Sequence, residues 1–389
     1  MNIVLLAWGF LSSIFVGAPV FYYFYTRHFS LRNWDIKRNE SYFPFVTILV
    51  PVYNEEKIIR YKLKNLSKLD YPKNHLQIIL IDDCSSDRTL YEIQAFKNSM
   101  SDLDLHVLSN PKRMGKTASL NRALEFAKGE IIVVSDADCF WPSTILRKAL
   151  PFLYDPSVGA VTGLEVLLNP KDSWVTQSEI FYNDAVHTIR VGESKIHSTI
   201  FFQGGFGAYK RNLLDKFDTE ADDSGTALNI IQKGARTFLL PEAVYFTAFP
   251  KLWKEKVTIK IRRASQLVRI WFKCTKLFIQ GKLLLPLSIF IPETFLYLVN
   301  PFIFASIIIL SIPIIFEYPI LVPIFLALSA IGFSYRKTKI LIIETVQNYL
   351  ILLCAIFLSV LKRNFSLWTT VRTSRTCLRK EMLEKMGLI

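Results

Sequence analysis

The strongest constraint on the fold of this chain is the placement of its apolar residues, which gather in residues 1–25 and again in residues 282–361. Residues 3–25 carry no charged side chain, and a run of roughly 23 residues is long enough to cross a hydrocarbon core of about 30 Å. The run has no basic segment before it and exceeds the apolar core of a signal peptide, so we expect a retained anchor. The polar residues between the two apolar regions predict a water-soluble domain of enzyme size.

The charges beside the first apolar run predict its orientation. Arg27, Arg32, Lys37 and Arg38 follow it directly, and basic residues next to a membrane segment favour the cytoplasmic side. We therefore expect a multi-pass protein of the cell membrane with its central domain in the cytoplasm. The five cysteines are odd in number and unclustered, which fits a reducing compartment better than a disulfide framework.

The formal net charge of +14 suggests an anionic partner. Nucleic acid is not expected, because no basic helix is interleaved with stacking aromatic residues and no spacing fits a zinc module. The basic segments beside the apolar runs and the basic tail, residues 362–385, instead fit attraction to anionic membrane lipids.

The region between residues 45 and 246 alternates β-branched apolar runs with amphipathic stretches, which predicts an α/β domain with a mostly parallel sheet. Expected strands occupy residues 46–52, 77–82, 105–108, 130–135, 158–162 and 237–240. Expected helices occupy residues 55–69, 87–96, 117–127, 142–153, 173–190 and 223–233. Polar clusters follow four of the strands, and strand carboxyl ends share one crevice in such a sheet. We expect the ligand site there.

The region after residue 246 has the pattern of a membrane-associated segment. Basic and apolar residues alternate at helical spacing in residues 251–273, as in a helix that lies on a bilayer surface. Three apolar runs follow, at residues 295–316, 320–333 and 340–361. The expected divisions are an N-terminal transmembrane helix (1–26), a catalytic domain (40–250), interfacial helices (251–282), transmembrane helices (283–361) and a basic cytoplasmic tail (362–389).

The number of C-terminal crossings stays open. Three full crossings would place the basic tail outside, against the charge rule. One alternative is that residues 340–361, which include Glu344, Gln347 and Asn348, are tilted, re-entrant or packed against the soluble domain. The other is that residues 283–316 form two passes broken at Pro292 or Pro301.

Asp136 and Asp138 end the buried strand expected at residues 130–135. Two hard oxygen ligands at a strand end suit Mg²⁺ or Mn²⁺ held jointly with a diphosphate, because these cations keep substrate oxygens in their coordination shells. An Asx-turn or a helix cap also explains such a pair when it occurs alone. The rest of the sequence has to decide between these interpretations.

Four motifs in register provide that context. They are Val50-Pro51-Val52-Tyr53-Asn54-Glu55-Glu56, Ile81-Asp82-Asp83-Cys84-Ser85-Ser86-Asp87-Arg88-Thr89, residues 110–116 with Asn121, and Asp136-Ala137-Asp138. Their order and spacing resemble family 2 glycosyltransferases over roughly residues 45–275, including membrane-bound cellulose, hyaluronan and poly-N-acetylglucosamine synthases. The resemblance implies a GT-A fold, a nucleotide-diphosphate sugar donor and inversion at the anomeric carbon.

The resemblance also implies roles in donor binding. Pro51, Tyr53 and Glu55 would line the nucleoside pocket, Asp83 would bind the base, typically uracil, and Lys116 would reach the phosphates. A carboxylate accepts from the imide N–H of the base, and a lysine neutralises diphosphate as a point charge. A solvated Lys116 is the simpler alternative. Asp136 would bind the donor together with the cation, and Asp138 would be the second metal ligand.

A downstream acidic pair resembles the catalytic base motif of the family. Asp222 and Asp223 follow a glycine-rich segment that contains Gly204 and Gly205, whose lack of a side chain permits close approach to the sugar. By resemblance Asp223 would remove the acceptor proton and Asp222 would support it, since adjacent acids raise each other's pKa. Two acids placed favourably at a helix N-terminus are the alternative.

Two features depart from the family pattern. Processive members carry Gln-x-x-Arg-Trp after the base motif, whereas this chain has one residue too many between Gln266 and Trp271. The expected partners of diphosphate or acceptor therefore remain a group of five candidates: Arg262, Arg263, Gln266, Arg269 and Trp271. The second departure is Cys139, which follows the metal acids where many synthases have histidine.

Together these features predict a metal-dependent inverting glycosyltransferase that moves a sugar, with UDP as the expected carrier, to a membrane-associated glycan or a lipid-linked acceptor. A processive polysaccharide synthase and a polyprenyl-phosphate sugar synthase both remain open, with a lean toward single or short additions because the Gln-x-x-Arg-Trp motif is degenerate. A catalytically silent membrane scaffold is the third alternative, and the intact acids argue against it.

Overall fold

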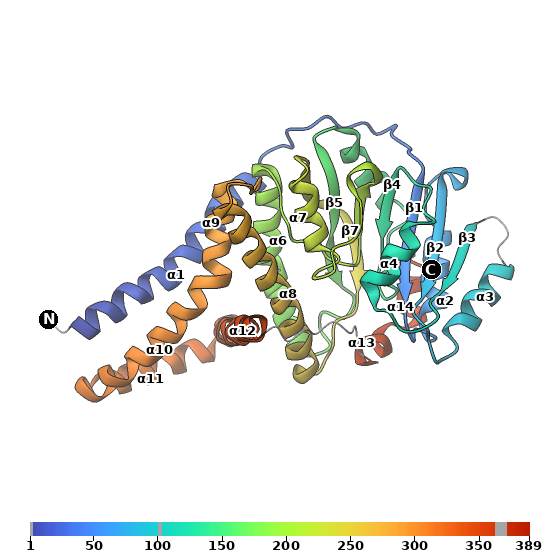
Figure 1. Cartoon of the computed structure of the whole chain (residues 1–389). Coiled ribbons are helices and arrows are strands. Elements are labelled where there is room, and N and C mark those ends of the chain that lie inside the picture. Colours follow the sequence, from blue (N-terminus) through green and yellow to red (C-terminus); the bar gives the residue numbers. More distant parts are fainter. Residues whose placement is uncertain (1–2, 100–102, 362–371) are drawn as a thin grey trace.

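A computed structural model describes residues 3–99, 103–361 and 372–389. Its centre is a seven-stranded sheet in the order β3-β2-β1-β4-β6-β5-β7 (Figure 1). The first four strands in sequence pair in parallel, β7 is parallel to β5, and β6 runs antiparallel to both β4 and β5. The predicted α/β class with a mostly parallel sheet is confirmed. The strands are β1 (Val46–Val52), β2 (Leu76–Asp82), β3 (Asp104–Ser109), β4 (Ile131–Val134), β5 (Val158–Leu167), β6 (Gly207–Lys210) and β7 (Arg236–Thr247).

Sequence patterns located six of these strands and missed β6. That strand has only four residues and begins with a glycine, so its hydrophobic pattern is too short to recognise. The prediction for β7 ended at residue 240, before Pro241, but the strand continues to Thr247. The pairing register of β5 and β7 shifts between Gly163 and Leu164, and such an irregularity accommodates a proline within a strand.

Helices cover both faces of the sheet. Alternate residues of β1 point to opposite sides, with Val50 in one buried cluster and Leu49 in another, as the two-residue period of a strand requires. The predicted helix at residues 142–153 is a short α-helix followed by a 3₁₀ turn that contains Pro151. The helices of this domain are α2 (Ile59–Ser67), α3 (Thr89–Ser99), α4 (Lys116–Leu124), α5 (Ile145–Ala149), α6 (Trp174–Ile196) and α7 (Ser224–Ile231).

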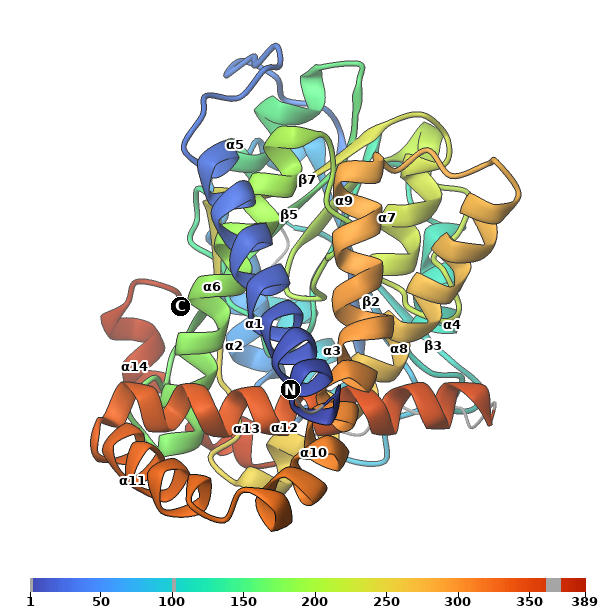
Figure 2. The ribbon, with the colours of Figure 1, turned by 90° about the vertical axis from the view of Figure 1, so that its left-hand side faces the viewer.

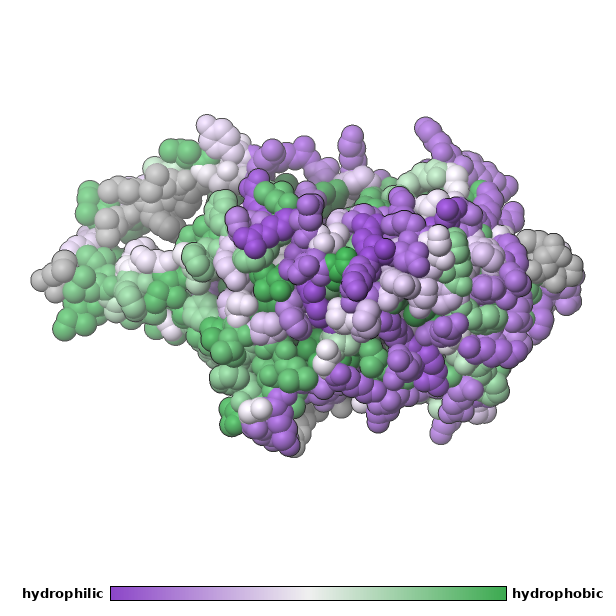
Figure 3. Space-filling view, turned by 90° about the horizontal axis from the view of Figure 1, so that it is seen from above, coloured by the Kyte–Doolittle hydropathy of each residue, from purple (hydrophilic) through white to green (hydrophobic). Residues whose placement is uncertain are grey.

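Apolar helices project from one side of this domain (Figures 1 and 2). Within the described residues, three helical segments are long and apolar enough to cross a membrane: α1 (Ile3–Ser30), the continuous segment Leu287–Glu317, and α12 (Arg336–Val360). Hydrophobic side chains gather at this end of the molecule, whereas the sheet domain is mostly hydrophilic (Figure 3). A shorter helix, α11 (Leu321–Ser334), connects the last two.

The segment Leu287–Glu317 is not broken at its prolines. It consists of α9 (Leu287–Thr294), a π-helical turn (Phe295–Val299) and α10 (Asn300–Glu317). Pro292 lies just before the π turn and Pro301 just after it. A π turn is a common way for a helix to absorb an interrupted hydrogen-bond ladder, so this segment is one continuous helical rod and not the two separate segments considered above.

The helix α12 lies crosswise to α1 and α9 and packs against α8 (Trp253–Ile279) (Figures 1 and 2). Glu344 of α12 is 3% exposed, and its carboxylate lies 2.5 Å from Lys256 Nζ and 3.1 Å from Lys260 Nζ. The polar residues of this apolar run therefore face α8, and both lysines also contact Glu179 of α6. The run is thus packed against the sheet domain through α8, which is one of the alternatives above.

The chain returns to the sheet domain after α12. The helices α13 (Arg372–Cys377) and α14 (Lys380–Lys385) pack beside the sheet domain (Figure 1). The first part of the predicted basic tail, residues 362–371, lies outside the described residues. The described part is on the same side of the apolar helices as the sheet domain (Figure 1).

Candidate active site

The loops after β1 and β2 are tied together at the carboxyl edge of the sheet. The Asn54 N–H donates to Ser85 Oγ at 2.9 Å, and Asn54 Oδ1 accepts from the Ser86 N–H at 2.8 Å. Asn54 and Cys84 have φ values of 54° and 61°, a left-handed conformation that asparagine tolerates better than most residues. These contacts fix the start of the segment that carries Glu55.

Asp83 anchors the loop that leads into α4. Its carboxylate accepts hydrogen bonds from Asn110 Nδ2, the Met114 N–H and the Gly115 N–H at 2.7–2.8 Å. Gly115 has a φ of 87°, which a residue with a side chain adopts only with strain. The chain turns sharply here, and the turn places Lys116 at the first position of α4.

Lys116 lies at the centre of three acids from different parts of the chain. Its Nζ is 2.9 Å from Asp136 Oδ1, 2.7 Å from Asp222 Oδ2 and 3.7 Å from Asp223 Oδ1. Asp136 follows β4, and the acidic pair precedes α7. Side chains that are up to 107 residues apart in the sequence, from 116 to 223, therefore meet in one cluster.

Gly204 closes this cluster from the adjoining segment. Its carbonyl accepts a hydrogen bond from the Asp136 N–H at 2.8 Å. A Cβ at this position would lie 2.4 Å from Asp136 Oδ2 and 2.6 Å from Lys116 Nζ, closer than real contacts allow. Gly205 is packed equally tightly, against the ring of Tyr245. Both glycines therefore permit other groups to approach the backbone closely. The groups that do so are protein side chains.

The surroundings of this cluster shift the pKa values of its carboxyl groups in opposite directions. Burial alone would lower the pKa of Lys116, but Asp136, Asp222 and Asp223 outweigh it and raise that pKa. Burial acts to raise the pKa of Asp136, yet Lys116 and Arg375 hold it below its usual value. Burial, together with the charge of Asp222, raises the pKa of Asp223 well above the ordinary value. A carboxylate with a raised pKa is a better proton acceptor, so Asp223 has the acidity expected of a general base.

Asp136, Asp138 and Cys139 form a group that can hold a metal ion. One ligand atom from each lies within 4.8 Å of the others. Burial, with the charge of Asp138, raises the pKa of the Cys139 thiol well above its usual value. A sulfur ligand is soft and suits metals such as zinc better than Mg²⁺ or Mn²⁺. The two carboxylates alone fit a hard cation such as Mg²⁺ or Mn²⁺, which completes its shell with other oxygens.

Comparisons with known proteins show the family and the fold. A model of the family described as "Glycosyl transferase family 2" matches residues 47–218. A solved structure of mannosyltransferase PcManGT from Pyrobaculum calidifontis, in complex with GDP-Man and Mn²⁺, is 30% identical, with a TM-score of 0.79 over 93% of this chain and 100% of that one. The chain belongs to glycosyltransferase family 2. Its fold is accordingly GT-A-like.

Curated relatives match this glycosyltransferase by sequence over shorter stretches. A β-monoglucosyldiacylglycerol synthase of Trichormus variabilis is 33% identical over 144 residues, which cover 37% of this chain and 31% of the synthase. The probable glycosyltransferase YdaM of Bacillus subtilis is 27% identical over 261 residues, 63% of this chain and 60% of YdaM. The chain thus spans about a third to three fifths of the length of these relatives.

Arg375, near the C-terminus, is a residue of the site that the sequence analysis missed. Its Nη2 lies 2.5 Å from Glu55 Oε1, and its Nη1 pairs with Asp138 Oδ2. Burial raises the pKa of Glu55 to about 7 even though Arg375 acts to lower it. Arg375 and Asp138 are 237 positions apart, and no motif marks the arginine.

Lys62 is a second missed residue. Its Nζ donates to Ser135 Oγ and to the Cys139 carbonyl, each at 2.6 Å, and lies 4.5 Å from the centre of the Trp141 ring. The side chain is fully buried behind the Asp136–Asp138 loop, whereas a lysine on an amphipathic helix is ordinarily solvated. Lys62 therefore supports the loop that carries the candidate metal ligands.

The expected nucleoside-binding residues line the first loop. Pro51 is buried within β1, and Tyr53 is half-buried directly after the strand. The guanidinium of Arg113 lies over the Tyr53 ring, 4.0 Å from its centre. The three predicted residues Pro51, Tyr53 and Glu55 are thus adjacent to the loop that Asp83 anchors.

The five candidates on α8 occupy different environments. Arg262 is half-buried and close enough to Asp222 and Asp136 to interact with their charges. Arg263 is exposed, whereas Gln266 and Arg269 are half-buried. Trp271 is fully buried in an aromatic cluster with Phe201 and Tyr297. The structure therefore brings Arg262 to the acids and places Trp271 in a packed core.

Proposed function

We propose that this family 2 enzyme is an inverting glycosyltransferase that moves a sugar from a nucleoside diphosphate to a glycan or lipid-linked acceptor at the cytoplasmic face of the cell membrane. The observation that carries the proposal is the cluster in which Lys116 Nζ contacts Asp136, Asp222 and Asp223 within 3.7 Å. The cluster combines an acidic pair that can remove a proton with a lysine ammonium group that can neutralise a diphosphate.

In the proposed reaction the acceptor oxygen attacks the anomeric carbon as the bond to the diphosphate oxygen breaks. Asp223 takes the acceptor proton, and Asp222 keeps the pKa of Asp223 raised by its adjacent charge. Lys116 neutralises the leaving diphosphate, with Arg262 as a second cation near the acids. A divalent cation on Asp136 and Asp138 would supply further charge neutralisation there.

The donor nucleotide has two candidates. The motifs around Tyr53 and Asp83 favour uracil by family resemblance, whereas the complex of the Pyrobaculum relative with GDP-Man and Mn²⁺ favours guanine and mannose. Both bases present N–H donors to a carboxylate. GDP-mannose is the first donor to test, because that relative matches nearly the whole chain.

A lipid-linked acceptor is favoured over a long glycan. The curated relative from Trichormus is named as a glucosyldiacylglycerol synthase, and the catalytic domain is joined to three helices that can cross or contact a bilayer. A processive synthase needs a path for its chain through the membrane. Product length from a radiolabelled donor separates the two classes.

Purified full-length protein in detergent provides the test of activity. A panel of nucleotide sugars with Mn²⁺ or Mg²⁺ should reveal one donor that is hydrolysed or transferred. Asp223→Asn should abolish transfer and retain nucleotide binding, because it removes the base and leaves the donor residues in place. Retained turnover in this variant would refute the assignment of the base. Absence of turnover with every donor and added membrane lipid would favour a silent scaffold.

A further inference from the structure

The last described segment of the chain, residues 372–389, packs onto the catalytic domain beside the candidate metal ligands. Leu383 and Leu388 lie in one buried cluster with Ile58 and Phe140. The Leu388 carbonyl also accepts a hydrogen bond of 2.7 Å from Asn65 Nδ2. These contacts make the segment part of the packed domain surface, and they hold α13 close to the site.

Arg375 in α13 joins this segment to two carboxylates of the site. Its Nε lies 3.0 Å from Glu55 Oε2, its Nη2 lies 2.5 Å from Glu55 Oε1, and its Nη1 pairs with Asp138 Oδ2. The Glu55 side chain is fully buried, and that of Arg375 is 11% exposed. A planar guanidinium fork bound to a buried carboxylate is a strong, geometrically specific contact.

Among the described residues, Lys116 and Arg375 form direct ion pairs with the acids of the site. Lys116 pairs with Asp136, Asp222 and Asp223, whereas Arg375 pairs with Glu55 and Asp138. A divalent cation bound by Asp138 would bring two positive charges against the guanidinium. Like charges at such short range repel strongly in a partly buried site. The cation and the guanidinium therefore compete for Asp138.

We propose that Arg375 is a positioning residue of the donor site, which holds Glu55 in place and occupies Asp138 until a divalent cation and a nucleoside diphosphate displace it. This inference rests on the proposed function, because it assigns Asp138 to the cation. After displacement the guanidinium keeps Glu55 as its buried partner. The cluster around Leu383 and Leu388 keeps the rest of the segment docked, so the change is confined to residues 372–377.

Mn²⁺ binding to the full-length protein in detergent, measured by calorimetry without nucleotide, tests the competition. Arg375→Gln frees Asp138, so Mn²⁺ should bind about tenfold more tightly than to the unmodified protein, the effect of removing one charge-assisted hydrogen bond. Arg375→Lys keeps the charge but loses the fork, and its affinity should fall between the two.

The Arg375→Gln substitution has a second effect on Mn²⁺ affinity, and a matched reference variant controls for it. Arg375→Gln leaves the Glu55 carboxylate without its cation, and that negative charge attracts Mn²⁺ by itself. The comparison is therefore repeated with Glu55→Gln as the reference. Under the proposal, the double variant Glu55→Gln/Arg375→Gln still binds Mn²⁺ about tenfold more tightly than Glu55→Gln alone. Equal affinities in this pair would overturn the proposal.

Hydrogen exchange of the unmodified protein gives a measurement that needs no variant. Amides in residues 372–377 should exchange faster when Mn²⁺ is added with GDP, or in a separate experiment with UDP, while those in residues 380–389 stay unchanged. Unchanged exchange in residues 372–377 of protein that has bound Mn²⁺ would overturn the proposal.

Asp138→Asn separates failure of this inference from failure of the proposed function. Loss of Mn²⁺ binding in this variant supports the metal site whatever the Arg375 variants show. Full Mn²⁺ binding by Asp138→Asn would reject both the metal site and the competition at it.

Discussion

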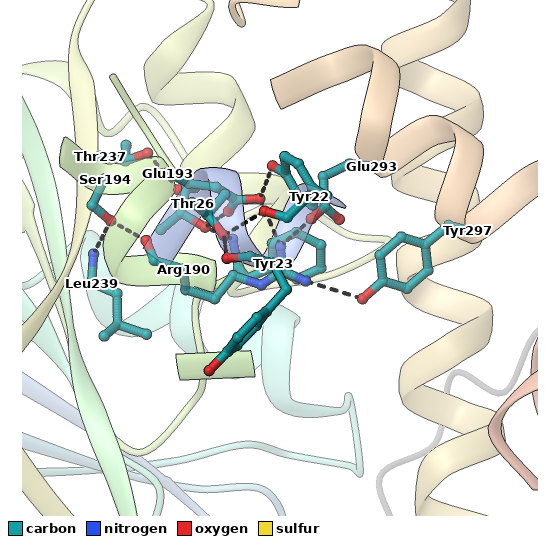
Figure 4. A network of polar contacts seen from close by, with 12 residues as sticks. Tyr22, Tyr23, Thr26, Arg190, Glu193, Ser194, Thr237, Leu239, Glu293 and Tyr297 are labelled. Atoms are coloured by element: carbon teal, nitrogen blue, oxygen red, sulfur yellow. Dashed lines mark hydrogen bonds and ion pairs between the residues drawn. The ribbon is translucent and has the colours of Figure 1, made fainter. Parts of the chain in front are cut away.

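Tyr22 of the first apolar helix donates a hydrogen bond of 2.8 Å to Glu193 of α6, which connects the membrane-side helix directly to the catalytic domain (Figure 4). Glu193 is fully buried, and Arg190 joins it to Glu293 of α9 with contacts of 2.9 and 2.7 Å. Thr199, next to the sheet, also donates to Glu193, at 2.7 Å. Three helices and the sheet domain are thereby held in one arrangement.

Tyr22→Phe should lower the stability of this junction without changing the chemistry. The substitution removes one buried hydrogen bond to a charged group, which is worth about 1–3 kcal/mol, while Glu193 keeps Arg190 and Thr199. We expect a lower melting temperature in detergent and an unchanged KM for the donor. Tyr91→Phe is the matched control, because Tyr91 is 68% exposed. Equal melting temperatures for the two variants would contradict a stabilising role of the Tyr22 hydroxyl.

The pH dependence of turnover should shift when Asp222 is replaced. Asp223 must be ionised to accept a proton, so activity should rise as the pH increases through its pKa. Burial raises that pKa first and the Asp222 charge second. Asp222→Asn removes the second contribution, while Lys116 still stabilises ionised Asp223. The acid limb of kcat/KM should therefore move to lower pH.

The control for this shift replaces an exposed carboxylate outside the cluster of acids. Asp215→Asn changes a carboxylate whose side chain is 79% exposed, and its pH profile should match that of the unmodified enzyme. An acid limb that stays in place in Asp222→Asn, or moves to higher pH, would exclude Asp223 as the titrating base.

Gly204→Ala should disrupt the site more than its size suggests. The added Cβ would lie 2.4 Å from Asp136 Oδ2 and 2.6 Å from Lys116 Nζ, so one of these side chains must move. Displacements of about 1 Å in a catalytic site can reduce turnover roughly a hundredfold. We expect a loss of that order in kcat, measured with the donor found above. Gly17→Ala is the control, since its Cβ would meet nothing within 4 Å; comparable turnover in both variants would argue against the close packing at Gly204.

Local sequence patterns were enough to predict the strands that carry the site. β1 and β2 are continuous buried runs, and the polar residues that follow each one lie together at the carboxyl edge of the sheet. The convergence of Asp136 with the distant acidic pair was also expected, because family motifs linked them. These features depend on residues close to one another in the sequence or on a known spacing.

Long-range electrostatic partners could not be predicted in the same way. Lys62 and Arg375 lie in segments that look solvated, and their role depends on the burial of Glu55 and of the loop after β4. The number of apolar crossings was open for a related reason. Glu344 is compatible with α12 only because Lys256 and Lys260 meet it from another helix, and hydropathy does not report such a pairing.

The contact of Arg375 with Asp138 predicts the membrane topology. It requires residue 375 and the catalytic domain to lie on one side, so we expect an even number of membrane crossings between residues 287 and 372. Because α12 packs crosswise on α8, we expect α9–α10 to lead away from the catalytic domain and α11 to return toward it. The 14 residues of α11 span only about 21 Å and fit a thinned or partly buried pass.

Cysteine labelling tests this topology. In protein whose exposed Cys84 and Cys354 are replaced by serine, Lys148→Cys and Lys380→Cys should both resist a membrane-impermeant maleimide in right-side-out vesicles and react after permeabilisation. Pro319→Cys, at the far end of α10, should react before permeabilisation. Labelling of Lys380→Cys but not Lys148→Cys in sealed vesicles would contradict the packing of the C-terminal segment on the catalytic domain.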